Sequence, residues 1–213
     1  MNTALQELTP TQLYPVEAID PIFGNLLHKR DEFVQQLMQC GLISEQLANS
    51  GALEAFGIWP ERNMDSLTHV LIGDAQGGPH HLRTIIDLDV PGRIIASDVR
   101  PPANASLPES EFRRAQKVRP NGIYRPNTVV IIDEAGQRKE SGSPMFPNEW
   151  TAEDVIKALI QVSLQPASNH NPERHSFMHE GIFGGVRTRV CTDDQTGKII
   201  TGYPKITGRF RLH

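Results

Sequence analysis

The stretch "GGVRTRVCTDDQTGKIITGYP", residues 184–204, decides the fold class because it has the pattern of a β-hairpin. Two runs rich in Val, Ile and Thr flank the turn-forming segment "DDQTG". Alternate side chains of a strand share one face, so we expect Thr201 and Tyr203 to lie side by side. A hydroxyl and a phenol there can hydrogen-bond a phosphate or stack on a base, although both are also ordinary residues of an edge strand.

Helical patterns lie on either side of a boundary near residue 60. Asp20 and Pro21 resemble an N-cap and first helical residue, and apolar residues recur at helical spacing until Gly41. A shorter helix is expected from Ser44, and Thr151 is expected to cap a helix over 151–164, with Trp150 as a core aromatic residue. We expect further strands, besides the two of the hairpin, at 83–89, 92–99 and 127–133. The polar, histidine-bearing segment 165–181 is expected to be a loop, flexible or functional.

The composition is that of an ordinary globular protein: 38% of the 213 residues are hydrophobic and 22% are charged. No apolar run approaches the ~18 residues needed to cross a bilayer, and the N-terminus lacks an export signal. We therefore expect a soluble chain that acts in the cytoplasm and does not enter membranes. The net charge of -4 argues against an extended nucleic-acid surface, while segments 111–125 and 197–213 are locally basic.

The segment "SLTHVLIGDAQGGPHHL", residues 66–82, concentrates histidines around glycine and proline. Gly77 and Gly78 let the backbone approach another group closely, so the segment is expected to be a shaped loop that carries imidazoles. Such a loop is typical of a metal site or of an acid/base pair, and His69, His80 and His81 are the candidate side chains.

Several motifs, in this order, resemble those of the EndoU endoribonucleases and in particular their bacterial toxin branch. The resemblance covers about residues 66–206, and the motifs that carry it are "THVLIGDAQGGPHHL", "NGIYRPNTVVIID", "SPMFPNEWTAEDVIKALIQV" and "GGVRTRVCTDDQTGKIITGYP" with its terminal Thr-x-Tyr-Pro. The resemblance implies an α+β fold like that of barnase, EndoU and RelE, with antiparallel sheets and packed helices. It divides the chain into an N-terminal helical segment, 1–63, and a nuclease domain, 64–213.

The resemblance implies RNA cleavage at or next to uridine, leaving a 2′,3′-cyclic phosphate and a 5′-hydroxyl. Imidazole can act as base or acid near neutral pH. By resemblance, His80 is the base and His69 the acid, because the family's Gly-Gly-x-His spacing selects His80 over His81. The resemblance also implies that Tyr203 is a catalytic residue that stacks on the sugar or base, and that Thr201 contacts uracil or phosphate.

The family pattern also requires a cation to stabilise the phosphorane, and here the chain departs from it. Ser141-Gly142-Ser143 stands where toxin relatives tend to carry a lysine. The candidate replacements are Lys139, Lys198 and Arg187, and the last two are also candidate substrate-binding residues together with Gly77 and Gly78.

The resemblance implies an RNA substrate, no required cofactor, and stimulation by Mn²⁺ in some members. A delivered toxin would have an immunity protein as a further candidate partner; the sequence sets no oligomeric state. Two alternatives stay open. One is a non-catalytic RNA-binding module on an EndoU scaffold. The other is a metallohydrolase that uses His170, His175 and His179 with Glu180 or Asp74.

Overall fold

A computed structural model describes the chain over residues 21–59, 62–74, 78–90, 93–95, 129–132, 138–141, 143–147 and 149–205. For 21–25 and for the strands between 93 and 141 it describes the backbone alone. The elements are α2 Pro21–Gln39, α3 Glu45–Ala48, η2 Ala52–Ala55, β1 Ile58–Trp59, β2 Met64–Asp65, α4 Ser66–Ile72, α5 Leu82–Asp87, β3 Arg93–Ile95, β4 Val129–Ile132, β5 Arg138–Ser141, α7 Ala152–Ser163, β6 Ala167–Asn171, η4 Pro172–Arg174, β7 Ser176–Phe183, β8 Val186–Asp193 and β9 Ile199–Pro204.

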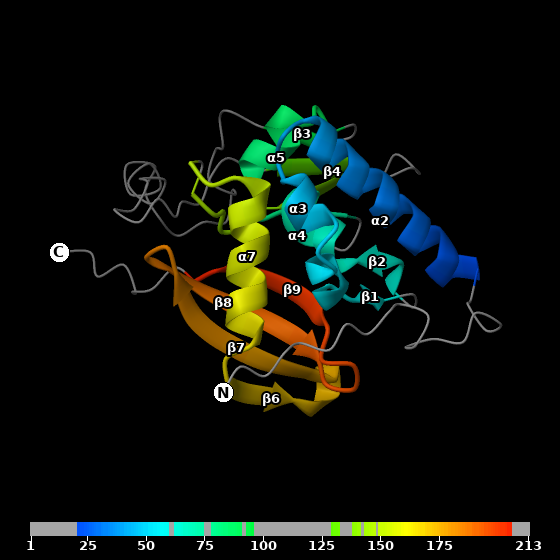
Figure 1. Cartoon of the computed structure of the whole chain (residues 1–213). Helices are drawn as coiled ribbons and strands as arrows, with labels where there is room; N and C mark the ends of the chain where they lie inside the picture. The colour runs from blue at the N-terminus through cyan, green and yellow to red at the C-terminus, as the bar shows by residue number, and fades with distance from the viewer. Residues whose placement is uncertain are drawn as a thin grey trace, which may run out of the picture.

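The largest sheet has the strand order β6-β7-β8-β9, and all of its pairs are antiparallel. Gly184 and Gly185, both with positive φ, form the tight turn between β7 and β8. Helix α7 crosses one face of this sheet (Figure 1). Its side chains Leu159 and Val162 pack against Gly202 and Gly181, where an added Cβ would come within 2.4 and 3.0 Å of them. The expected α+β class and the expected hairpin are confirmed.

A β-bulge sets the register of β9 against β8. Thr192 is paired with Ile199, whereas Cys191 is paired with Thr201, so Ile200 is the extra residue. Ile199 and Ile200 are consequently both buried, which breaks the usual alternation of a strand. Beyond the bulge, Arg189 is paired with Tyr203 on the face of the sheet that α7 does not cover.

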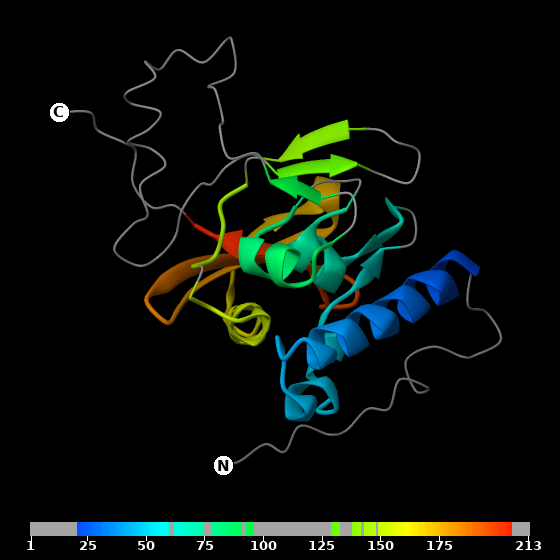
Figure 2. The same cartoon turned by 90° about the horizontal axis from the view of Figure 1, so that it is seen from above.

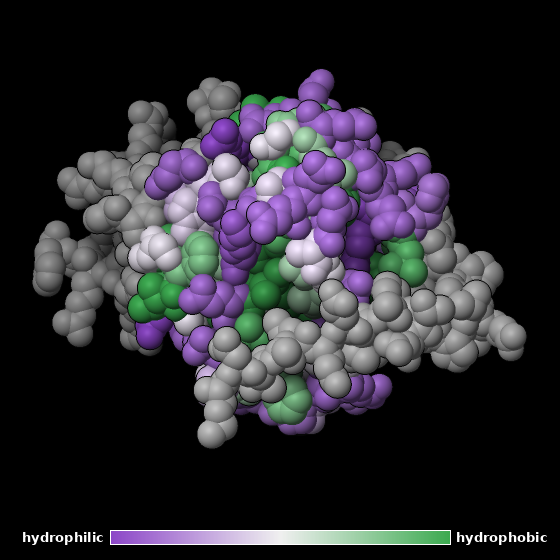
Figure 3. Space-filling view, in the orientation of Figure 1, coloured by the Kyte–Doolittle hydropathy of each residue, from purple (hydrophilic) through white to green (hydrophobic). Residues whose placement is uncertain are grey.

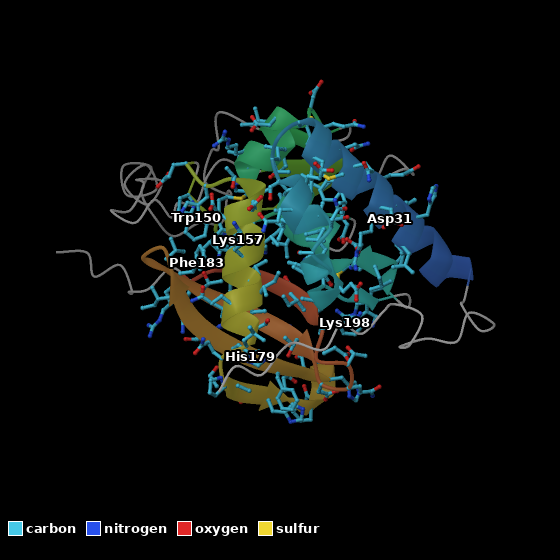
Figure 4. The ribbon with its side chains drawn as sticks, viewed as in Figure 1. Asp31, Trp150, Lys157, His179, Phe183 and Lys198 are labelled. Carbon is cyan, nitrogen blue, oxygen red and sulfur yellow. The ribbon has the colours of Figure 1, made fainter. Side chains whose placement is uncertain are left out.

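Helix α7 begins as the sequence predicts. Thr151 is its N-cap, and its hydroxyl accepts a hydrogen bond from the backbone of Asp154, whose carboxylate accepts one from the backbone of Thr151 in return. The indole of Trp150 stacks on Phe146 and meets Phe183 edge-on, with ring centroids 5.5 and 5.6 Å apart. These contacts fix the end of α7 that lies nearest the β7–β8 turn (Figure 4).

The predicted N-terminal helix is α2, and it packs into the same hydrophobic core as α4 and α7. Phe33 and Leu37 of α2 belong to one buried cluster with Leu67 of α4 and Leu159 of α7. The outer surface of α2 is hydrophilic (Figure 3). In the described part of the chain, every helix is too short or too polar to cross a bilayer.

Arg30 ties α2 to the following segment. Its guanidinium, almost fully buried, forms an ion pair with Asp65 and donates hydrogen bonds to the carbonyl oxygens of Phe56 and Gly57 at 3.0 and 2.9 Å. Asp65 in turn caps α4 by accepting a hydrogen bond from the backbone of Thr68. The helix that carries His69 is thus connected directly to α2.

Two smaller antiparallel sheets complete the described structure, β1-β2 and β3-β4-β5. The second lies on the opposite side of the molecule from α7 (Figure 2). Strands β3 and β4 fall inside the predicted runs 92–99 and 127–133, whereas β5 was not predicted.

Three predictions of local structure were wrong. Residues 83–89, expected as a strand, lie mostly in helix α5, whose buried Leu82 and Ile85 are one helical turn apart. The segment 165–181, expected as a loop, contains β6 and most of β7. His69, expected in a loop, lies on helix α4.

Candidate active site

His69 lies on the short helix α4, and its ring meets a carboxylate. Its Nδ1 atom is 3.1 Å from Oδ2 of Asp74, which follows directly after the helix-ending Gly73. Both atoms are buried, and they would form an ion pair with the imidazole protonated. A carboxylate in this position orients the imidazole and stabilises positive charge on it.

The loop between α4 and α5 places His80 by close backbone contacts. Gly78 has φ +69°, and a Cβ on it would lie 2.3 Å from the carbonyl oxygen of His69. The backbone amide of His80 donates to the carbonyl of Val70, and its carbonyl accepts from the amide of Phe146, both at 2.8 Å. The backbone of His80 is therefore held from both sides. Gly77, predicted for this loop, lies outside the described residues.

The side chain of His80 is buried and has one defined tautomer. Its Nδ1 donates to the carbonyl oxygen of Pro144 at 3.0 Å, since a carbonyl can only accept. Nε2 is therefore the nitrogen that carries the lone pair in the neutral ring. Burial lowers the pKa of His80 to about 4; the hydrogen bond to Pro144 opposes this shift, and nearby His69 adds to it. His80 is consequently neutral at pH 7.

His81 has a different environment, although it is the next residue. Its ring is fully buried; Nε2 donates to the carbonyl oxygen of Trp150 at 3.1 Å, and Nδ1 accepts from the hydroxyl of Thr84 at 2.6 Å. Burial lowers the pKa of His81 to about 4. Because both ring nitrogens are engaged, His81 has the contacts of a structural residue.

Tyr203 brings β9 to the histidines. Its ring lies against that of His80, with centroids 5.6 Å apart and planes tilted by 34°. The register predicted for the strand places Thr201 on the same face, where both side chains are partly buried. The structure therefore brings together His69, His80 and Tyr203, with Thr201 two residues along.

A charged cluster that was not predicted from the sequence adjoins Tyr203. Arg189 donates to Oε1 of Glu180 through Nε and Nη2, at 3.0 and 2.6 Å, and its Nη1 is 3.4 Å from the Tyr203 hydroxyl. Lys205 donates to both oxygens of the same carboxylate, at 2.7 and 2.9 Å. In the sequence, the spacing in "VRTRV" indicates that Arg187 and Arg189 share one face of a strand. It does not indicate which face of the sheet that is. We call Glu180, Arg189 and Lys205 the β-face cluster.

The predicted cations are not all near the histidines. Lys198 precedes β9 by one residue, at the strand end remote from Tyr203, and its pKa is lowered by burial and by Arg30 (Figure 4). Arg187 is exposed on β8, two residues from Arg189. Lys139 lies in β5, for which the structure describes the backbone alone.

The histidines of the metallohydrolase alternative do not converge. His170 and His175 lie 3.1 and 3.8 Å from one carboxylate oxygen of Asp194, and both are exposed. His179 is buried under α7, between the carbonyl of Gln165 and the hydroxyl of Thr192 (Figure 4). Within the part of the chain that the structure describes, no group of three or more His, Cys, Asp or Glu side chains could hold a metal ion.

Comparison with known proteins agrees with the motifs. The family model described as bacterial EndoU nuclease matches residues 63–206, about two thirds of the 213 residues. No curated protein and no solved structure matches the chain. The match confirms the resemblance seen in the sequence, and it contains His69, His80 and Tyr203. The chain belongs to the bacterial EndoU nuclease family.

Proposed function

We propose that this protein is an endoribonuclease that cleaves single-stranded RNA at or next to uridine. Its family indicates a nuclease that acts on RNA. One observation carries the finer proposal: two neighbouring imidazoles have opposite environments. His80 is buried, neutral and hydrogen-bonded through Nδ1 to a carbonyl, whereas His69 faces the carboxylate of Asp74. A buried, neutral imidazole near a second imidazole that faces a carboxylate can supply the base and the acid of acid/base catalysis.

In the proposed reaction, Nε2 of His80 takes the proton of a ribose 2′-hydroxyl. The 2′-oxygen forms a bond to the adjacent phosphorus, and the bond from phosphorus to the 5′-oxygen breaks. Protonated His69 gives its proton to the departing 5′-oxygen, with Asp74 holding the ring. The products are a 2′,3′-cyclic phosphate and a 5′-hydroxyl, and no water enters this step.

Tyr203 and Thr201 support the substrate part of the proposal. Tyr203 lies against His80, so a nucleotide stacked on its ring would place its ribose near the base. Thr201, on the same face, offers a hydroxyl that can donate to and accept from a base edge. The preference for uridine itself rests on the family resemblance.

The test is incubation with an RNA oligonucleotide that holds a single uridine, in the presence of EDTA, followed by end-group analysis. We expect one cut beside the uridine, with cyclic phosphate and 5′-hydroxyl ends. The same oligonucleotide with 2′-deoxy sugars at the uridine and at the nucleotide before it should stay intact, because the nucleophile for a cut on either side of the uridine is missing. Cleavage of the deoxy substrate, or 5′-phosphate ends, would exclude this mechanism. Tight binding without any cleavage would favour the non-catalytic RNA-binding alternative.

A further inference from the structure

We propose that Arg189 is the cation that contacts the scissile phosphate, and that Glu180 positions it. This inference rests on the proposed function, because it assigns the charge stabiliser for which the sequence offered Lys139, Lys198 and Arg187. A phosphorane carries more negative charge than the ground-state phosphate, and a fixed cation beside it lowers the barrier.

The contacts of Arg189 hold its guanidinium in one orientation. Glu180 accepts from Nε and Nη2, which fixes one edge of the planar group. The remaining nitrogen, Nη1, is thereby turned toward the Tyr203 hydroxyl, 3.4 Å away, and the guanidinium carbon is 6.0 Å from the tyrosine ring centroid. Tyr203 itself lies against His80. The side chain of Tyr203 therefore lies between Arg189 and His80, the proposed base.

The β-face cluster keeps a net positive charge. One carboxylate, Glu180, pairs with two cations, Lys205 and Arg189, and these pairs lower the pKa of Glu180. The pKa of Arg189 is raised, first by Glu180 and then by Tyr203. One carboxylate faces one ammonium and one guanidinium group, so the formal charge of the cluster is one positive charge. An anion arriving beside Tyr203 would meet it.

Two of the cations that the sequence offered, Lys198 and Arg187, fit this role less well. Lys198 lies near Arg30, five residues before Tyr203 on an extended strand, which is about 16 Å along the chain. Arg187 is exposed at the β7–β8 hairpin, two residues nearer the turn than Arg189. Arg189 is about one quarter exposed, so it is both held and reachable. The N–H groups of Nη1 and Nη2 that Glu180 does not use can donate to phosphate oxygens.

The experiment compares Arg189→Met, Arg189→Lys and Glu180→Gln with Lys157→Met, a charge-loss control on α7 at the opposite face of the sheet. Single-turnover cleavage is measured at saturating uridine-containing RNA, and folding is checked by thermal unfolding. We expect Arg189→Met to lose ~100-fold or more in rate. Arg189→Lys should recover part of that loss, and Lys157→Met should match the unaltered protein. Glu180→Gln should lose ~10-fold, because it loosens Arg189 without removing it.

Chemical rescue distinguishes a structural role of Arg189 from a role in contacting the scissile phosphate. Added guanidinium should restore part of the rate of Arg189→Ala and should not change that of Lys157→Met. A rate within ~3-fold of the unaltered protein for Arg189→Met, or a rate loss that follows unfolding and resists rescue, would overturn the inference.

A binding measurement distinguishes failure of the proposed function from failure of the inference about Arg189. If the unaltered protein cleaves no RNA, binding of the 2′-deoxyuridine oligonucleotide decides the phosphate contact by fluorescence anisotropy. Binding weakened ~10-fold or more in Arg189→Met relative to Lys157→Met would support the contact. Equal affinities of these two variants would overturn it.

Discussion

The Nδ1 atom of His69 lies 3.1 Å from the Oδ2 atom of Asp74. With this carboxylate beside Nδ1, Nε2 is the nitrogen through which the proposed proton delivery would run. The pairing also distinguishes His69 from His80, whose Nδ1 meets an uncharged carbonyl. The two imidazoles thus differ through the groups behind them.

Asp74→Asn should lower single-turnover cleavage by ~100-fold, because the ring loses the charge that stabilises its protonated form. Asp87→Asn is the matched control: Asp87 is an exposed carboxylate paired with Arg83 on α5. It should leave the rate unchanged. Equal rates for the two variants would show that Asp74 has no part in proton delivery.

Substitution of His69 or His80 should reduce activity, whereas substitution of His81 should reduce stability. His69→Ala and His80→Ala should each lose at least ~100-fold in turnover and still fold. His81→Ala should leave the turnover of folded molecules nearly unchanged. It should lower the free energy of unfolding by about 2–4 kcal/mol, because it creates a cavity and leaves the Trp150 carbonyl and the Thr84 hydroxyl unpaired. Urea unfolding and single-turnover assays measure both quantities. A His81 variant that folds normally but is inactive would contradict this division of roles.

Stability should fall on acidification below about pH 6.5. Burial lowers the pKa of both His80 and His81 from 6.5 to about 4, so the unfolded chain binds protons that the folded chain does not. The free energy of unfolding should therefore decrease as pH falls from 6.5 to 4, by about 3 kcal/mol for each histidine.

The comparison variant is His80→Asn, followed by urea unfolding at several pH values. Around pH 5 its slope should be smaller than that of the unaltered protein by one proton, or about 1.4 kcal/mol per pH unit. An unchanged slope would mean that His80 titrates normally in the folded protein.

Gly78→Ala should be far more damaging than Gly41→Ala. Both glycines have positive φ, +69° and +67°, so both substitutions add backbone strain of about 1 kcal/mol. At Gly41 a Cβ meets nothing within 4 Å, whereas at Gly78 it would lie 2.3 Å from the carbonyl oxygen of His69. We expect Gly78→Ala to displace the loop and abolish cleavage, with a loss of thermal stability beyond that of Gly41→Ala. Similar activities for the two variants would contradict the close approach of the loop to His69.

Arg30→Met should destabilise the protein by about 3–5 kcal/mol, because it leaves the buried carboxylate of Asp65 without its cation. Lys157→Met, which removes an exposed cation from α7, should change stability little. Denaturant unfolding of both variants tests this. A small effect at Arg30 would mean that water replaces the guanidinium at Asp65.

Local signals explain which parts of the fold were predictable from the sequence. The turn before β9 and the cap of α7 depend on neighbouring residues, and both were predicted correctly. The segment 83–89 was misjudged because a short run of β-branched residues fits a strand and a buried helix equally well. Only the packing of Leu82 and Ile85 into the core selects the helix.

One bulged residue, Ile200, made the charged part of the site unpredictable from the sequence. Without the bulge at Ile200, Arg189 would be paired with Gly202, and Tyr203 would be paired with Thr188 on the face that α7 covers. The bulge moves Tyr203 to the face of Arg189, and nothing in the local sequence fixes such a shift. The histidines were easier to find, because glycine spacing marks their loop. Their distinct surroundings come from Pro144, Trp150 and Asp74, of which the first two are more than sixty residues away.

Because α2 shares a core with α4 and α7, a fusion or transferred gene segment that encodes this nuclease should include α2. The family match begins at residue 63, so a fusion or a swapped gene segment designed from it would start there. Such a piece would lack Phe33 and Leu37 over the buried Leu67, and it would carry Asp65 without Arg30. The segment that the family model matches is thus shorter than the segment that shares the buried core. A transferable nuclease should begin no later than Pro21, where α2 starts.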